Sequence, residues 1–95
     1  MFGDGRFRLT EVRGRRDRHD IVAEILETAR GGAIKTHIMY KAKLSYTQLE
    51  GYTNLLVEKG FLQRHAIFRD ARTQDIFVTS VQGEKFLRNY RTLEL

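Results

Sequence analysis

The sequence of 95 residues lacks cysteine, contains no long apolar run, and has no acidic residue over positions 28–49. Without cysteine the chain forms no disulfide and offers no thiolate to a metal. Nothing approaches the roughly 18 consecutive apolar residues that a membrane-spanning helix needs, so no membrane span is predicted. The polar, arginine-rich N-terminus also lacks the apolar segment of a secretory signal.

Catalytic and metal-binding patterns are missing as well. His19, His37 and His65 lie far apart, without metal-ligand spacing or a paired carboxylate, and are interpreted as surface or partly packed side chains. Gly31-Gly32 precedes no lysine-serine signature, so it does not form a phosphate-binding loop. We therefore expect no enzyme, no cofactor, no metal and no small-molecule ligand.

The chain does have an excess of positive charge. Lysine and arginine outnumber the acids by 17 to 12, which gives a net charge of +5. The acid-free stretch is the most uniformly positive part, with Arg30, Lys35, Lys41 and Lys43. Such a balance favours polyanionic partners, because neutralising phosphates releases their counterions. A hydrophobic content of 41% is enough for one small core, so a single domain is expected.

Residues 35–62 have the pattern of a helix-turn-helix. A first helix is expected to open near Thr36, and a second to follow Ser45, which forms a capping box with Gln48 three residues later. Gly60 would supply the left-handed residue that ends the second helix. Apolar residues at helical spacing form the buried stripe of this helix, which consists of Leu49, Tyr52, Leu55 and Leu56. Tyr40 of the first helix either packs against a neighbouring helix or stacks outward, and packing is the favoured expectation.

Two further helices are predicted, one on each side of the motif. The first spans residues 17–30, is capped by Asp17, and buries Ile21, Val22, Ile25, Leu26 and Ala29. The last starts after Thr79 or Ser80 and runs to residue 93. Its apolar face contains Val81, Phe86, Leu87, Tyr90 and Leu93. This face would close over the rest of a monomer, or pair in part with a second copy in a dimer.

Residues 61–68 and 74–78 are rich in β-forming residues and flank a polar tip at residues 69–73. We interpret them as two antiparallel strands that form the wing of a winged helix, with Arg69 and Arg72 at its tip. The predicted fold is mainly α with a small antiparallel β-hairpin (α+β): a three-helix core, a wing and a C-terminal helix over residues 15–95. Residues 1–14 are either a basic arm, a short strand or a frayed tail.

The motif resembles an archaeal winged helix-turn-helix DNA-binding family, which includes a ten-kilodalton chromatin protein and small transcriptional regulators. The matching residues are Lys35-Thr-His-Ile-Met-Tyr-Lys-Ala, Leu44-Ser-Tyr, Tyr52, Leu55 or Leu56, Glu58-Lys-Gly-Phe-Leu, and Ser80-Val-Gln-Gly-Glu-Lys-Phe-Leu. The resemblance implies double-stranded DNA as the ligand, a recognition helix that starts at Ser45-Tyr46, and a homodimer formed through the last helix. The chain departs from the family at Glu50-Gly51, where members often carry basic residues, and its last helix is too short for a long coiled coil.

A recognition helix places its exposed polar face in the major groove. The expected contacts from this helix are Ser45, Tyr46, Thr47, Gln48, Gly51 and Asn54. Phosphate and wing contacts are expected from Lys35, Thr36, Lys41, Lys43, Arg69 and Arg72. Glu50 would meet a cytosine or repel the DNA backbone. Any soluble helix also presents a polar face, and a cationic turn can simply be solvated.

Three functions are therefore open. The first is a sequence-preferring transcriptional regulator in the cytoplasm, associated with the nucleoid. The second is an architectural chromatin protein that covers DNA with little base preference. The third is a winged helix used for protein contacts, which Glu50 and Gly51 on the presumed reading face favour and the acid-free stretch disfavours.

Overall fold

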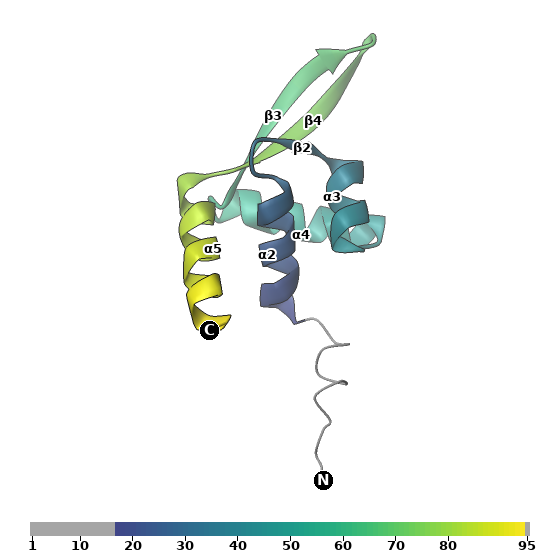
Figure 1. The fold of residues 1–95 in the computed structure, drawn as a ribbon. Coiled ribbons are helices and arrows are strands. Elements are labelled where there is room, and N and C mark those ends of the chain that lie inside the picture. Colours follow the sequence, from purple (N-terminus) through teal and green to yellow (C-terminus); the bar gives the residue numbers. More distant parts are fainter. Residues whose placement is uncertain (1–16, 95) are drawn as a thin grey trace.

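The structure is a computed structural model that describes residues 17–94 (Figure 1). The predicted basic arm at residues 1–14 lies outside the described residues and stays a prediction. The elements in chain order are α2 (Arg18–Thr28), β2 (Ala33–Ile34), α3 (Lys35–Ala42), α4 (Tyr46–Glu58), β3 (Leu62–Arg69), β4 (Arg72–Thr79) and α5 (Val81–Glu94). The predicted α+β architecture of a helix-turn-helix, a wing and a C-terminal helix is confirmed. No helix in this part of the chain is long and apolar enough to cross a membrane.

Side-chain caps define where three of the helices begin. Asp17 caps α2 in a capping box, as the sequence predicts. Ser45 caps α4: its Oγ accepts from the Gln48 amide at 3.1 Å, and Gln48 Oε1 accepts from the Ser45 amide at 2.9 Å. Ser80 rather than Thr79 caps α5, since its Oγ accepts from the Gly83 amide at 3.1 Å. Because each cap satisfies amides that have no partner within the helix, it sets the first turn of that helix.

The sheet has three antiparallel strands in the order β2-β4-β3, and β3 and β4 project from the helices as a long ribbon (Figure 1). The sequence did not reveal β2, which consists of Ala33 and Ile34. A strand of two residues is too short to show the alternation of apolar and polar side chains that identifies a strand. The predicted tip at residues 69–73 is too wide. Arg69 pairs with Arg72, and only Asp70 and Ala71, both with positive φ, connect the strands. Two positive-φ residues match the right-handed twist of the flanking strands, which makes so tight a connection possible.

The core is formed by apolar side chains from every element. Its fully enclosed members include Ile25 and Leu26 of α2, Ile38 of α3, Leu49 and Leu56 of α4, Leu62 of β3, Phe77 of β4 and Leu87 of α5. Two predictions of burial are wrong: Tyr40 is 82% exposed and Leu55 is 39% exposed. Val81, placed on the apolar face of the last helix, is 73% exposed in the single chain. On α3 the buried positions are Ile38 and Ala42, so Tyr40 points away from the core. Val81 is the first residue of α5, and Leu55 lies at the edge of the buried stripe of α4.

The C-terminal helix α5 packs beside α2 within one chain (Figure 1). The ring of Phe86 lies between those of Phe61 and Tyr90, at centroid distances of 5.7 and 6.3 Å. The Tyr90 hydroxyl donates to Asp20, and Leu87 is buried. The central part of the predicted apolar face of α5 is therefore used to close the monomer.

Candidate nucleic-acid interface

The side of α4 that faces away from the core carries short polar side chains. Its buried positions are Leu49, Thr53 and Leu56, and Thr47, Gly51 and Asn54 are exposed. A Cβ atom built on Gly51 would meet no atom within 4 Å. At this point another macromolecule can therefore approach the helix backbone closely.

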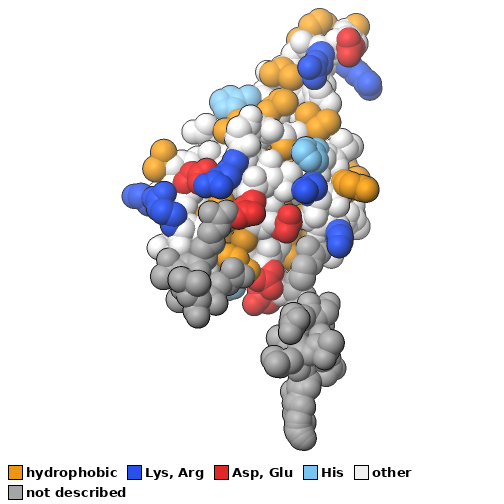
Figure 2. All heavy atoms as spheres, viewed as in Figure 1, with side chains coloured by type: hydrophobic (Ala, Val, Ile, Leu, Met, Phe, Trp, Pro, Cys, Tyr) orange, Lys and Arg blue, Asp and Glu red, His pale blue; other side chains and the backbone are white. Residues whose placement is uncertain are grey.

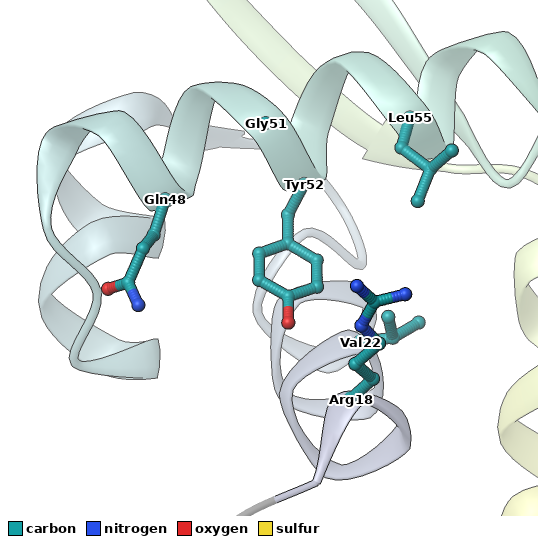
Figure 3. A pocket seen from close by; sticks show the side chains of 6 residues that line it. All are labelled: Arg18, Val22, Gln48, Gly51, Tyr52 and Leu55. Carbon is teal, nitrogen blue, oxygen red and sulfur yellow. The ribbon is translucent and has the colours of Figure 1, made fainter.

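Two of the predicted contact residues at the start of α4 also hold the helix together. The Ser45 hydroxyl and the Gln48 carbonyl oxygen are both engaged in the capping box. The amino group of Gln48 is left to face outward as a donor. Figure 3 shows that the Gln48 side chain lies along the side of α4 that overlooks α2, together with Gly51, Tyr52 and Leu55.

Lys35, Tyr46 and Glu50 form a cluster at the junction of α3 and α4. Lys35 Nζ lies 2.5 Å from Glu50 Oε2 and 5.7 Å from the centre of the Tyr46 ring. Hydrogen bonds from Lys35 and then from Tyr46 lower the pKa of the Glu50 carboxyl. The same contact with Glu50 raises the pKa of Lys35. Glu50 therefore neutralises a lysine of the preceding helix instead of standing alone on the exposed face.

This ion pair predicts a pH dependence. Because the pKa of Glu50 is lowered by folding, the pair stabilises the fold above the ordinary glutamate pKa of about 4.3, and this contribution is lost as pH falls through the lowered value. We expect Lys35→Gln to raise the pKa of Glu50 towards that ordinary value, as followed by NMR titration of its side-chain carboxyl carbon. Lys41→Gln, which removes an exposed lysine of the same helix, should leave the Glu50 pKa unchanged. A Glu50 pKa equally low in wild type and Lys35→Gln would contradict the assignment.

Arg64 of β3 belongs to the same surface, although the sequence analysis did not single it out. Its Nη2 donates to Asn54 Oδ1 at 2.9 Å, and its guanidinium carbon lies 5.2 Å from the centre of the Phe77 ring. Packing of β3 against α4 brings these residues together. Asn54 is therefore held by a cation that could itself contact phosphate.

The remaining predicted phosphate contacts of the motif lie on α3 and at its end. Thr36, Lys41 and Lys43 are exposed, and Lys43 adopts a left-handed conformation with φ of 56° where α3 turns towards α4. The exposed ring of Tyr40 stands beside Lys41 and Lys43 around a shallow hollow of about 600 Å³. The structure thus groups Lys41 and Lys43, whereas Lys35 is drawn towards α4.

The wing carries the last two predicted contacts away from the helices. Arg69 and Arg72 are paired residues on either side of the turn, with Asp70 between them. Basic and acidic side chains meet at the tip of the wing in Figure 2, and apolar side chains lie along it. Phe68, next to Arg69, is 77% exposed. The wing arginines therefore form a group separate from Lys41 and Lys43 of the helix-turn-helix.

The structure contains no arrangement that suggests a metal centre in the part of the chain that it describes. Among residues 17–94, no three histidine, aspartate or glutamate side chains come together in a group that could bind a metal ion.

Comparisons with known proteins agree with this architecture. A family model described as winged helix-turn-helix matches residues 15–95. Sso10a-2, a DNA-binding protein from Sulfolobus solfataricus, is similar with a TM-score of 0.69 and 19% identity, covering 82% of this chain and 78% of that protein. A possible transcriptional regulator from Methanosarcina mazei Go1 has a TM-score of 0.60 and 15% identity, with coverage of 94% and 81%.

A more distant similarity is to a mutant of MepR from a multidrug-resistant S. aureus clinical isolate. Its TM-score is 0.62 at 12% identity, and the match covers 76% of this chain and 51% of that one. A comparison with curated proteins found no match. At such low identities the structural similarities establish the fold alone. The family model spans all of the described residues, and the chain belongs to the winged helix-turn-helix family.

Proposed function

We propose that this protein binds double-stranded DNA and regulates transcription, with α4 lying in the major groove. The observation that carries the proposal is the exposed face of α4, where Thr47, Gly51 and Asn54 surround open space. An α-helix fits the major groove, and short polar side chains can reach base edges there. The description of Sso10a-2 as DNA-binding and of the Methanosarcina protein as a possible regulator supports the same function.

In this proposal the two halves of the surface have different tasks. Tyr46, Thr47, Gln48 and Asn54 contact bases or the adjacent phosphates, and Gly51 allows the helix to approach closely. Lys41 and Lys43 at the end of α3, together with Arg69 and Arg72 on the wing, neutralise phosphates. Lys35 does so only after Glu50 releases it, and Ser45 acts mainly by setting the start of α4. Phosphate contacts position the protein, and base contacts select the sequence.

Binding to random and selected duplexes at several salt concentrations tests the proposal. DNA binding should weaken steeply with salt, because each neutralised phosphate releases counterions. Thr47→Ala should reduce the preference for a selected sequence and leave binding to random duplexes nearly unchanged. Thr28→Ala, a threonine of α2 whose hydroxyl bonds to the Glu24 carbonyl, is the matched control. Equal sequence preference in wild type and Thr47→Ala would remove Thr47 from the reading face.

Homodimerisation through α5 and a location at the nucleoid in the cytoplasm belong to the same proposal. Since Phe86, Leu87 and Tyr90 close the monomer, a dimer would have to use the outer side of α5, where Val81 is exposed. Sedimentation of the free protein and of its DNA complex measures this directly. The arm at residues 1–14 is proposed to follow phosphates beside the winged helix of residues 15–95.

A second function is favoured by two exposed aromatic side chains. Tyr40 and Phe68 are 82% and 77% exposed, and aromatic residues are enriched where proteins bind one another. In that case the winged helix would be a protein-interaction module. An affinity for random duplex DNA that hardly changes with salt would favour this function, whereas salt-sensitive binding without any sequence preference would indicate an architectural chromatin protein.

A further inference from the structure

A groove lies between α4 and the start of α2. It encloses about 400 Å³ and is lined by Arg18, Val22, Gln48, Gly51, Tyr52 and Leu55. Figure 3 shows the Tyr52 ring extending from α4 towards α2. The Arg18 guanidinium and Leu55 lie on the side of this ring opposite Gln48. This volume falls within the range of small-molecule sites in proteins, roughly 300–1,000 Å³.

The polar side chains that the described residues contribute to this groove, those of Arg18, Gln48 and Tyr52, are all able to donate a hydrogen bond. Arg18 makes no ion pair with any residue in the described part of the chain. The carbonyl oxygen of Gln48 is taken by the Ser45 amide, which leaves the amino group of Gln48 as the available part of that side chain. The hydroxyl of Tyr52, at the centre of the groove, has no hydrogen-bond partner among residues 17–94. Among residues 17–94, no carboxylate lines the groove.

The rest of the lining is apolar. Val22 and Leu55 provide the aliphatic walls, and the Tyr52 ring lies between them and Gln48 (Figure 3). Leu55 is 39% exposed, although it lies at the edge of the apolar stripe of α4 whose member Leu56 is buried. A ligand that covered Leu55 and Val22 would remove this apolar surface from water.

We propose that the groove between α2 and α4 binds a small organic carboxylate with an aromatic or aliphatic body. The carboxylate meets Arg18 and the neutral donors Gln48 and Tyr52, and the body covers Val22 and Leu55. An arginine guanidinium matches the two oxygens of a carboxylate, and donors without a competing acid favour an anion. A DNA phosphate would satisfy the same donors but leave the apolar walls uncovered, so the lining favours the small amphipathic anion.

Such a ligand would act on the proposed DNA-binding function, and this part of the inference rests on it. Gln48 and Gly51 line the groove and also belong to the exposed face of α4 that we assign to DNA. A ligand in contact with both residues competes with the approach of a duplex. Because coupling between two ligands is reciprocal, the carboxylate weakens DNA binding by the same factor by which DNA weakens carboxylate binding.

Binding of benzoate to the full chain, followed by NMR of backbone amides, tests the site without DNA. We expect saturable shifts at Arg18, Val22, Gln48 and Gly51. Acetate lacks the apolar body, benzamide lacks the charge, and inorganic phosphate has charge alone; each should bind at least about tenfold more weakly. Shifts elsewhere, or equally strong binding of acetate or inorganic phosphate, would overturn the proposal.

Two variants separate the charged and apolar halves of the site. Arg18→Gln and Leu55→Ser should each weaken benzoate binding about tenfold or more, and both replace exposed side chains, so folding should persist. Lys59→Gln, another exposed cation at the far end of α4, should bind benzoate as wild type does. Unchanged benzoate affinity in both site variants would overturn the assignment.

A competition experiment distinguishes failure of the site from failure of the proposed function. Benzoate at a concentration that just saturates wild type should weaken duplex binding by wild type, and it should weaken duplex binding by Arg18→Gln clearly less. If the wild-type protein binds benzoate but no DNA, the DNA-binding proposal is overturned and the proposal of a carboxylate site stands. Equal duplex affinity with and without benzoate would overturn the coupling.

Discussion

Gly83→Ala is expected to destabilise the fold, although alanine is the better helix former. A Cβ atom at Gly83 would lie 2.5 Å from the carbonyl oxygen of Phe61 and 2.7 Å from Thr79 Cγ2. The Phe61 carbonyl also accepts from the Ser80 amide at 3.0 Å, so it cannot move without breaking the junction between α4, β4 and α5. Overpacking of this kind costs about 1–3 kcal/mol, which exceeds the gain of about 1 kcal/mol from helix propensity.

Gly51→Ala is the matched control, because this glycine also lies within a helix but faces open space. There the propensity gain is unopposed, and stability should rise by about 1 kcal/mol. Urea unfolding of both variants and the wild type measures the difference. A Gly83→Ala variant as stable as Gly51→Ala would mean that α5 does not sit against the Phe61 carbonyl. In that case, close packing would no longer explain why glycine occupies position 83, the third residue of α5.

The double variant Arg69→Gln/Arg72→Gln should have the largest effect on DNA binding. These arginines flank the two-residue turn of the wing, where backbone pairing of the strands does not depend on their side chains. If each neutralises one phosphate, the slope of log affinity against log salt falls by about 0.9 per lost contact, or roughly 1.8 for both. Affinity should fall for every duplex alike, because phosphate contacts carry no base information.

Lys59→Gln/Lys85→Gln removes the same charge from the C-cap of α4 and from an exposed position in the second turn of α5, and it serves as the control. Its salt slope should stay close to that of the wild type. Fluorescence anisotropy with random and selected duplexes at several salt concentrations gives both slopes. A changed base preference in the wing variant would assign Arg69 or Arg72 to base reading. Equal slopes in the two double variants would show that net charge, rather than the wing, controls binding.

Local chemistry explains why much of the fold could be predicted. Capping is decided by residues three apart, so Asp17 and Ser45 could be placed at the starts of α2 and α4 from their neighbours alone. The left-handed conformation of Gly60, with φ of 84°, follows in the same way from its place after a helix. The short strand β2 escaped prediction because its pairing with β4 depends on residues more than 40 positions away.

Exposure on a helix was harder to predict than the helix itself. Tyr40 was expected to be packed and is 82% exposed, because the rotation of α3 about its axis depends on what surrounds it. The pairing of Lys35 with Glu50 could not be foreseen either, since the residues are 15 apart and meet only through the angle between α3 and α4. Arg64 reached Asn54 through the packing of β3 against α4.

The amino-acid sequence was sufficient for the order of the four helices and the two wing strands, the caps of α2 and α4, the absence of cysteine chemistry and the positive segment of the motif. Each of these depends on composition or on contacts within one or two turns of chain. The neutralisation of Lys35, the donors gathered between α2 and α4, and the closure of α5 over α2 depended on the tertiary structure. They arise where segments distant in the chain pack together, because packing fixes rotations and angles that no local pattern encodes.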